Sequence, residues 1–386
     1  MGTAWDVAVI GAGVFGSWTA YQLAESGKKV LLVDGYGVAN PLSSSGAESR
    51  IMRTAYGANE AYTRFAHQSL PDWMKLFRST GADPDRFFLK TGVLWLGKKD
   101  GELLAASQES MRRAGVNFEV LEADEIRNRY PQIDPGGDVA ALLEPDAGVL
   151  LADRCVQAVV SAARRQRGVT FLPESVRVPV TDPTGIRTLE GTPINAETYV
   201  FACGAWLPKV FPELLHNLIR PTKQEHFYFG VPPGNADFSP QRLPAWIDDT
   251  DPRMPYGLPD IGGQGVKMGF HREGPPFDPD HDDRLASPEA VEEARRYLAA
   301  RFPELRHAPL IASKICQYEN SPSGDFLIDR HPDFPNVWFM GGGSGHGFKH
   351  GPFVGVYVAG RILGYVAEFK PFTLAAAIQA SRRTIL

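Results

Sequence analysis

The chain has 386 residues, 43% of them hydrophobic, so it is long enough to bury the cores of about two or three domains. A formal net charge of −5 gives no electrostatic reason to expect nucleic acid or an anionic membrane as a partner. Three cysteines without a C-x-x-C pair form neither a disulfide framework nor a zinc site. We expect a soluble cytoplasmic protein, because the N-terminal segment lacks a signal-peptide pattern and the long apolar stretches are interrupted.

Residues 5–35 contain a pattern typical of dinucleotide-binding folds. An apolar strand runs directly into GAGVFG, followed by a helix and a second buried strand, KVLLVD, that ends in an acid. Gly11 allows a tight turn, Gly13 lets the backbone approach a pyrophosphate, and Gly16 lets the helix pack on the strand. Asp34 would accept hydrogen bonds from the adenosine ribose, which disfavours NADP but does not separate NAD from FAD.

The rest of the chain favours FAD. After Asp34 the sequence does not continue as regular βαβ repeats, and further nucleotide-domain strands are predicted only within 198–206 and near the start of 336–363. The latter segment reads as a strand, a glycine-rich loop and a helix. No second strand–GxGxxG–helix–acid unit exists for a nicotinamide cofactor, so electrons should enter a flavin directly from an organic substrate.

The inserted segments are predicted to form a second domain. Strands are expected at 90–97, 116–121 and 309–318, antiparallel strands within 226–271, and helices at 101–115, 122–130 and 287–302. The fold class is α/β, a Rossmann-like, glutathione-reductase-like FAD-binding domain with an inserted antiparallel-sheet substrate domain. The predicted boundaries are 1–85, 147–220 and 320–386 for the FAD-binding domain, and 86–146 and 221–319 for the substrate domain. The acids of loop 271–284 are expected to solvate it, and no metal site is predicted.

Four further segments resemble the monomeric sarcosine oxidase family: GAESRIMRTAYG, VKMGFH, CQYENSPSGDFLIDRHP and GGGSGHGFKHGP. That family includes N-methyltryptophan oxidase and pipecolate oxidase, and belongs to the D-amino-acid-oxidase-like flavoproteins. The resemblance implies hydride transfer from an N-methyl or cyclic amino acid to FAD, giving an imine that hydrolyses, with O2 reduced to hydrogen peroxide. It also implies a monomer whose partners are a small amine substrate and O2.

The resemblance implies that FAD is joined covalently through its 8α-methyl group to Cys316 in KICQY. A free cysteine taken alone is more often a small buried hydrophobe, and Cys155 and Cys203 keep that interpretation. Forming a thioether requires thiolate character, which neighbouring positive charge or dipoles supply.

The same resemblance assigns the charged residues of the site. Arg53 and Lys349 match a cation pair for the substrate carboxylate, and Lys267 matches an oxygen-activating lysine whose ammonium stabilises transient superoxide. A surface charge is the alternative for each of them. In an alternating strand Lys267 would share a face with Gly269 and His271, so one wall would carry both lysine and histidine.

The remaining assignments concern the amine pocket and the cofactor. His271 and Tyr256 match residues that line the amine pocket, where the neutral form would position the deprotonated amine, although His271 could equally be a wall residue. Tyr318 and His346 are expected beside the substrate, and Gly341 and Gly342 near the cofactor. The other cofactor contacts implied are Ser45, Arg50, Val176, Gly343, Gly345, Gly347 and Lys349.

The chain departs from the family pattern at several positions. Gly46 and Ala47 stand where a histidine and a glycine are expected, Ser49 replaces a threonine, and Gly343 replaces an alanine or aromatic residue. Sarcosine itself is therefore a family default rather than a deduction.

A further expectation is that Trp246, with Asp248 and Asp249, shapes the far end of the substrate pocket and favours a cationic or polar substituent. Two alternatives to the oxidase stay open. One is an FAD-dependent dehydrogenase that uses an acceptor other than O2. The other is a non-catalytic FAD-binding subunit of a larger complex, which the presence of Arg53, Lys267 and Lys349 disfavours.

Overall fold

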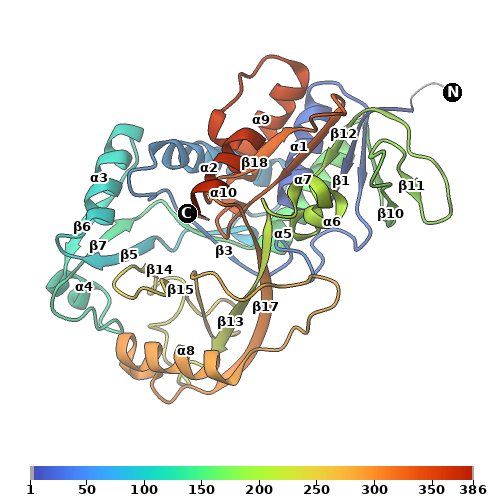
Figure 1. Cartoon of the computed structure of the whole chain (residues 1–386). Coiled ribbons are helices and arrows are strands. Elements are labelled where there is room, and N and C mark those ends of the chain that lie inside the picture. The colour runs from blue at the N-terminus through green and yellow to red at the C-terminus, as the bar shows by residue number, and fades with distance from the viewer. Residues whose placement is uncertain (1–3, 385–386) are drawn as a thin grey trace.

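A six-stranded sheet carries the N-terminal motif in the computed structural model, which describes residues 4–384 (Figure 1). The strand order is β18-β19-β12-β1-β2-β9, and every pair is parallel except β18 with β19. The central strands are buried apolar runs, as a sheet covered on both faces requires. The strands are β1 (Trp5–Ile10), β2 (Val30–Val33), β9 (Val169–Leu172), β12 (Ala196–Phe201), β18 (Leu327–Arg330) and β19 (Val337–Gly341).

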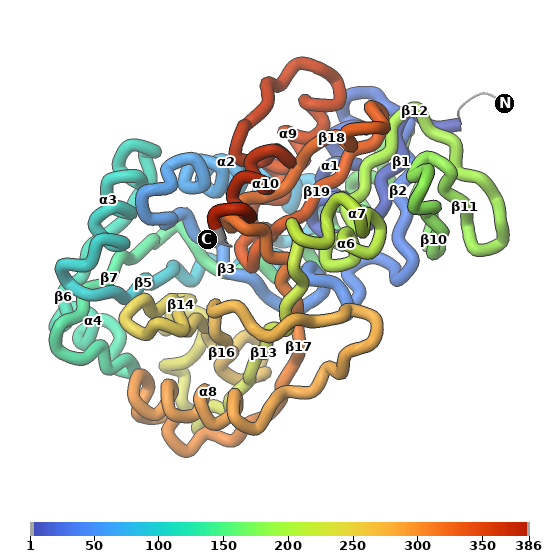
Figure 2. The backbone as a smooth tube through the Cα atoms, viewed as in Figure 1, coloured from blue at the N-terminus to red at the C-terminus, as the bar shows by residue number. Residues whose placement is uncertain are grey.

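Helices cover both faces of this sheet. One core cluster joins its first face to α1 (Val14–Glu25), α2 (Glu60–Ser79), α5 (Ala152–Arg165) and α9 (Gly351–Leu363). The cluster on the other face includes residues of α6 (Leu207–Val210), α7 (Pro212–Leu215) and α10 (Leu374–Thr384), beside the hairpin β10 (Val176–Arg177) and β11 (Arg187–Thr188). Figure 2 shows α9, near the end of the chain, lying beside α1 from its beginning, and in the sheet β12 lies between β19 and β1.

The second sheet has eight strands in the order β17-β13-β16-β15-β14-β5-β7-β6. Its pairs are antiparallel except β14 with β5, which is parallel and departs from the expected arrangement. Its strands are β5 (Val93–Lys98), β6 (Glu119–Glu122), β7 (Val139–Glu144), β13 (Arg220–Phe229), β14 (Ala245–Asp248), β15 (Pro255–Leu258), β16 (Val266–Phe270) and β17 (Leu310–Asn320).

Helix α8 (Pro288–Arg301) packs on the back of the second sheet. It begins where the sequence predicts, since the Ser287 side chain accepts a hydrogen bond from the Ala290 N–H. The other elements of this half are α3 (Glu102–Ala114) and α4 (Ala123–Arg129).

A small sheet, β3-β8-β4, and short 3-10 turns complete the described chain. The strands are β3 (Arg50–Met52), β4 (Phe88–Leu89) and β8 (Gly148–Leu150), and the turns are η1 (Pro84–Arg86), η2 (Gly204–Trp206), η3 (Pro303–Leu305), η4 (Phe348–His350) and η5 (Lys370–Phe372). The strands of each large sheet come from several stretches of the chain that alternate with those of the other sheet. The predicted domain boundaries stay a prediction. Within residues 4–384, no helix is both long and apolar enough to cross a membrane.

The side chains of β14 do not lie where the sequence predicted, because Trp246 and Asp248 are on the face away from the substrate pocket. Trp246 is fully buried in the core between the second sheet and α8, so it does not reach the substrate cavity described below. Asp248 is also fully buried, and its carboxylate accepts hydrogen bonds from Tyr297 (3.0 Å) and Arg301 (2.9 Å). The residue of β14 that lines the cavity is instead Ile247, because neighbouring side chains of a strand point to opposite faces.

Replacing Asp248 with alanine leaves the guanidinium of Arg301 partly buried and unpaired. We expect the free energy of unfolding to fall by about 3 kcal/mol, measured by urea denaturation. Asp249→Ala is the matched control at the end of the same strand and should cost under about 1 kcal/mol, as is usual away from buried networks. Equal losses in the two variants would contradict this account of Asp248.

Candidate active site

A cavity of about 410 Å³ lies between the carboxyl ends of the parallel strands and the front face of the eight-stranded sheet. Ligands of open α/β sheets bind at this edge. Every residue predicted to contact cofactor or substrate lines the cavity except Gly16, Gly342 and the three residues predicted at the far end of the pocket, Trp246, Asp248 and Asp249. These lining residues are Gly11, Gly13, Asp34, Ser45, Arg50, Arg53, Val176, Tyr256, Lys267, His271, Cys316, Tyr318, Gly341, Gly343, Gly345, His346, Gly347 and Lys349.

The start of α1 forms one end of this cavity. Gly11 has a φ of +106°, and a Cβ there would lie 2.3 Å from the carbonyl oxygen of Ala202, so only glycine fits. Gly13 precedes the helix without a side-chain cap, which leaves backbone N–H groups for a ligand, while the Val14 N–H donates to Ser45 Oγ. Gly16 lies away from the cavity against Gly11, which is the close packing expected of the third glycine.

Asp34 directly follows β2 and lies at the same end of the cavity as the glycine turn. Its carboxylate accepts hydrogen bonds from the backbone N–H groups of Ala12 (2.8 Å) and Tyr36 (2.9 Å). Burial raises the pKa of Asp34, and these N–H groups oppose the shift. The acid therefore fastens the glycine turn to β2 while it lines the cavity.

Cys316 lies on β17 with 8% of its surface exposed, and the guanidinium of Arg50 approaches its sulfur at 3.6 Å. Arg50 is held by the carbonyl oxygens of Ser44 (2.6 Å) and Ser49 (2.8 Å). A cysteine beside a fixed positive charge has the surroundings of a reactive thiol.

The other two cysteines lack such a neighbour among the contacts of the described residues. Cys155 is buried in the core beneath α5, and burial raises its thiol pKa well above the usual value. Cys203 lines the nucleotide end of the cavity, and burial raises its thiol pKa to about 12. Both are poor nucleophiles at neutral pH, which agrees with the expectation that they have no chemical role.

Lys267 is not a surface residue, because only 3% of it is exposed and it lies within the cavity wall. Its Nζ donates to the Ser49 carbonyl oxygen (3.3 Å) and Oγ (3.2 Å), and lies 5.7 Å from the centre of the Tyr228 ring. Burial, together with the positive charge of Arg50, lowers the pKa of Lys267 to about 7. His271, which follows the last residue of β16, lines the same cavity as Lys267.

One row of side chains crosses the front of the eight-stranded sheet, because residues paired in register share a face. The row consists of Trp95, Ile247, Tyr256, Gly269 and His226, on β5, β14, β15, β16 and β13. The Tyr256 hydroxyl and the His226 Nε2 are 2.7 Å apart. A Cβ on Gly269 would lie only 3.0 to 3.1 Å from both side chains, so the glycine makes room for their hydrogen bond.

The imidazoles of this wall are neutral at physiological pH. Burial, aided by the charges of Arg53 and Lys349, lowers the pKa of His271 to about 4. Burial and the charge of Lys267 hold the pKa of His226 well below its usual value. His226 was not predicted from the sequence, since only the pairing of β13 with β16 brings it to the cavity.

Arg53 and Lys349 form a pair of cations at the opposite wall. The guanidinium of Arg53 stacks between the rings of Tyr56 (4.3 Å) and Trp95 (4.7 Å) and donates to the Ala55 carbonyl oxygen. Lys349 is 3% exposed, and its Nζ donates to the His346 carbonyl oxygen (2.9 Å) and lies 5.0 Å from the Tyr56 ring.

Neither cation forms an ion pair with a carboxylate within the described residues. Burial, with the charge of Arg53, lowers the pKa of Lys349 well below its usual value. The nearby buried Glu144 instead accepts hydrogen bonds from Thr54 (2.7 and 2.6 Å) and the Ala55 N–H (3.1 Å). The cation pair is therefore available to a bound anion.

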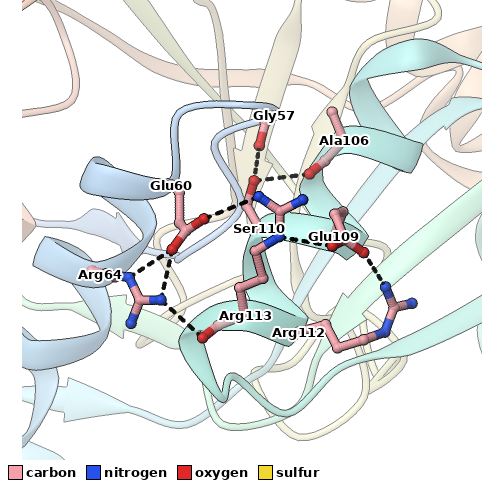
Figure 3. Close-up of polar contacts among 8 residues, drawn as sticks. All are labelled: Gly57, Glu60, Arg64, Ala106, Glu109, Ser110, Arg112 and Arg113. Atoms are coloured by element: carbon pink, nitrogen blue, oxygen red, sulfur yellow. Dashed lines mark hydrogen bonds and ion pairs between the residues drawn. The ribbon is translucent and has the colours of Figure 1, made fainter.

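Helix α3 supports the turn that carries Arg53 and Tyr56. Ser110 Oγ donates to the carbonyl oxygen of Gly57 (2.5 Å), and the Gly57 N–H donates to Ser107 Oγ (2.9 Å). An exposed ion-pair network joins α2 to α3 beside this turn (Figure 3), and its members are Glu60, Arg64, Glu109, Arg112 and Arg113. Exposed pairs contribute little stability, so the two serines do most to fix the turn.

Tyr56 also joins two histidines. Its hydroxyl lies 3.1 Å from His346 Nδ1 and 2.7 Å from His350 Nε2. His346 Nε2 faces the Gly324 carbonyl oxygen at 3.0 Å and must donate to it, which makes Nδ1 the acceptor for the tyrosine hydroxyl. Burial and the charge of Lys349 lower the pKa of both histidines, so this network stays neutral.

The glycine-rich loop after β19 packs tightly on the wall behind it. A Cβ on Gly345, whose φ is +75°, would lie 2.5 Å from the Tyr318 ring, and one on Gly343 would lie 2.8 Å from Glu319 Oε1. Gly342 packs against Asp325 and Leu327 and does not line the cavity, so its predicted approach to the cofactor stays a prediction.

Glu319 is the acid that sequence reasoning missed on this wall. Its Oε2 accepts a hydrogen bond from Ser44 Oγ (2.9 Å), and burial raises its pKa to about 7. Its place next to Cys316 on β17 is visible in the sequence, but the loops that enclose it come from distant segments.

The acids of loop 271–284 do more than solvate it. Asp278 and Asp280 both pair with Lys209 at 2.5 Å, and Asp280 also accepts from the Trp206 indole N–H and lines the cavity. Asp278, Asp280 and His281 have ligand atoms within 4.8 Å of one another, and Lys209 already forms an ion pair with each of the two acids.

The fold and this cavity define an FAD-dependent oxidoreductase. Residues 6–361 match the family described as FAD dependent oxidoreductase, and the chain belongs to that family. The glycine cradle, the uncapped helix start and the thiol beside Arg50 are compatible with FAD as the ligand.

Comparison with known proteins narrows this class. The chain is 32% identical over 368 residues to the monomeric sarcosine oxidase of Bacillus sp. (strain NS-129), with 93% of each chain covered. It is 30% identical to the peroxisomal sarcosine oxidase of Homo sapiens, over 91% of this chain and 90% of that one. It is 28% identical to the N-methyl-L-tryptophan oxidase of Escherichia coli O139:H28, over 96% and 98%. The protein is thus an oxidoreductase of the sarcosine oxidase and N-methyl amino acid oxidase type.

Solved structures share the fold. L-proline dehydrogenase from P. horikoshii superposes with a TM-score of 0.83 at 21% identity, covering 98% of this chain and 99% of that one. Fructosamine oxidase (Amadoriase II) from Aspergillus fumigatus gives a TM-score of 0.81 at 21% identity, with 99% and 92% covered.

Glu319→Gln tests the buried acid. Because its folded-state pKa of about 7 lies above the ordinary value of 4.5, Glu319 costs no stability at low pH and destabilises the fold as pH rises from 4.5 through 7. Glutamine removes this cost, so urea unfolding of the flavin-free polypeptide, made under riboflavin limitation, should show a variant stabilised by roughly 2 kcal/mol at pH 8 relative to pH 5. Exposed Glu197→Gln should show no such difference, and a pH-independent effect of Glu319→Gln would contradict the assignment.

Proposed function

We propose that the protein oxidises the secondary amine of an N-methyl or cyclic amino acid, with FAD linked covalently to Cys316 and O2 as electron acceptor. Bound FAD would accept a hydride equivalent from the carbon beside the amine nitrogen and pass the electrons to O2, and the imine product would hydrolyse. The observation that carries the proposal is the cation pair of buried Lys349 and partly buried Arg53. Neither has a carboxylate partner among the described residues, and both lie in the cavity that also holds Cys316 and Lys267.

Arg53 and Lys349 would bind the substrate carboxylate. A planar guanidinium offers two parallel donors to a carboxylate, and the ammonium of Lys349 adds a third. Stacking of Arg53 between Tyr56 and Trp95 restricts the guanidinium, so little conformational freedom remains to be lost on binding.

His271, Tyr256 and His226 would face the amine. Transfer of a hydride equivalent requires an uncharged nitrogen, and a neutral imidazole or phenol can bond to it without supplying charge. The lowered pKa values of both histidines and the cations around them disfavour a protonated amine in the cavity.

Cys316 would form the covalent bond to FAD, and Arg50 would assist its formation. Arg50 lies 3.6 Å from the sulfur that would attack the 8α carbon, and a fixed positive charge beside a cysteine is typical of reactive thiols. Forming the thioether removes one hydrogen from the thiol and one from the methyl group, and the two electrons released pass to the flavin and then to O2.

The proposed acceptor separates the oxidase from a dehydrogenase of the same fold. Lys267, buried beside Arg50, would stabilise the negative charge that develops on oxygen. We also propose that the chain acts as a monomer, because several of its relatives are named monomeric sarcosine oxidase.

Acid denaturation tests the tether. Flavin absorbance should remain with wild-type polypeptide precipitated in acid, whereas Cys316→Ser should release all of its flavin or purify without it. Cys203→Ser is the matched control, because Cys203 lines the same cavity without a nearby guanidinium, and it should retain the flavin. Free extraction of flavin from fully loaded wild-type protein would exclude the covalent bond but leave FAD binding intact.

Lys267→Met tests the role in oxygen chemistry. Loss of the buried ammonium should slow reoxidation of the substrate-reduced enzyme by O2 by roughly 100-fold, read in a stopped-flow instrument, with a smaller effect on anaerobic reduction. The wild-type reoxidation rate should fall as pH rises through about 7, where Lys267 loses its proton. Lys314→Met, an exposed lysine 5.6 Å from the same Tyr228 ring, is the control.

If Lys267→Met is reoxidised at the wild-type rate, the lysine has no part in this step. If the reduced wild-type enzyme forms no peroxide on aeration, the acceptor is not O2 and the dehydrogenase alternative is correct.

A further inference from the structure

The cavity has an apolar wall between the cation pair and Lys267. It is formed by Ile51, Trp95, Ile247, Met254 and Leu258, which come from β3, β5, β14, the turn before β15, and β15 itself. These five residues also belong to one hydrophobic cluster, with Trp95, Ile247 and Leu258 in its buried core and the other two packed against it. They therefore form one continuous surface, which we call the apolar wall.

Strand register places this wall relative to the charged groups. Trp95 stacks on Arg53 (4.7 Å) at one end of the wall, and Leu258 is paired in register with Lys267 at the other. Ile247 is paired with Tyr256 between them. An amino acid whose carboxylate lies on Arg53 and whose amine lies near Tyr256 would direct its side chain or N-substituent against the apolar wall.

The apolar wall offers a substrate no hydrogen bond. Four of its side chains have no N–H or O–H group, and the indole nitrogen of Trp95 is covered from contact. The polar groups at its border, Tyr256, His226 and His271, are those proposed above to face the amine. A polar substituent bound here would lose its hydrogen bonds to water without replacement.

We propose that the enzyme selects secondary amino acids with an apolar side chain or N-substituent of branched aliphatic or cyclic type, in preference to sarcosine or polar analogues. This proposal rests on the proposed function above and specifies its substrate class. It replaces the expectation of a cationic or polar substituent, which depended on Trp246 and Asp248, both now assigned to the opposite face of the sheet.

Binding of carboxylates that lack an amine measures the apolar wall without any turnover. Acetate, 4-methylpentanoate and succinate correspond to glycine, leucine and aspartate without nitrogen, and their affinities are read from the flavin absorbance of the holoenzyme. Because each buried methylene improves affinity by roughly fourfold, 4-methylpentanoate should bind at least about tenfold more tightly than acetate or succinate. Equal or tighter binding of acetate or succinate would overturn the proposal.

Turnover then tests the same ranking with amines. N-methylleucine should exceed sarcosine and N-methylaspartate in kcat/KM by roughly tenfold or more. If the carboxylates follow the apolar ranking but none of the amines reduces the flavin, the apolar wall is supported while the proposed reaction is wrong. If sarcosine or N-methylaspartate is oxidised best, the reaction is supported and the selectivity is wrong.

Ile247→Thr and Ile311→Thr form a matched pair of variants. Ile247 lies in the apolar wall, whereas Ile311 is exposed on β17. The preference for 4-methylpentanoate over acetate should shrink by roughly tenfold in Ile247→Thr and stay unchanged in Ile311→Thr. Unchanged acetate affinity in Ile247→Thr will show that the cation pair is intact, and an unchanged preference would remove Ile247 from the proposal.

Discussion

The site depends on four cations, held in or beside the cavity without an ion pair to any carboxylate in the described part of the chain. They are Arg50, Arg53, Lys267 and Lys349, and each donates to a backbone carbonyl oxygen. Carbonyl oxygens and aromatic rings satisfy the donors but do not cancel their charge. Because two of these side chains are almost fully buried, the charge is screened little by water. The protein therefore keeps a positive cavity that is completed by an anionic ligand.

Burial, and after it this positive charge, keeps the histidines of the cavity neutral. His226, His271 and His346 all have pKa values lowered by burial and then by one or more of the four cations. Protonating any of them would add a further positive charge to the same enclosed volume. Under the proposed function, the cavity would bind a carboxylate while the groups that face the amine stay neutral, which is the combination that oxidation of an uncharged amine requires. The cations and the neutral imidazoles are consequences of one electrostatic arrangement.

Features formed by residues close together in the sequence could be predicted, whereas contacts between distant segments could not. The glycine turn and Asp34 lie within 35 residues and are local, so the pattern was readable. Lys267 and Cys316 stand in ordinary strand segments, and only the family resemblance distinguished them from core or surface residues. His226 and Glu144 carried no local signal, since strand pairing and hydrogen bonds to residues 54–55 bring them to the site. Trp246 was misplaced by a single position, because a one-residue shift along a strand exchanges the cavity face for the core.

Successive side chains of a strand alternate between the two faces of the sheet, so one sheet can contribute both to the core and to the proposed selectivity. On β14, Trp246 packs into the core against Phe302 while its neighbour Ile247 lines the cavity. The cations come from β3 and the residue that follows it, from β16 and from η4, whereas most of the apolar wall comes from β5, β14 and β15. The residues proposed to bind the carboxylate and support oxygen chemistry are therefore different from those proposed to contact the substituent. Substitutions in the apolar wall can change which amine is accepted and leave the charge of the cavity as it is.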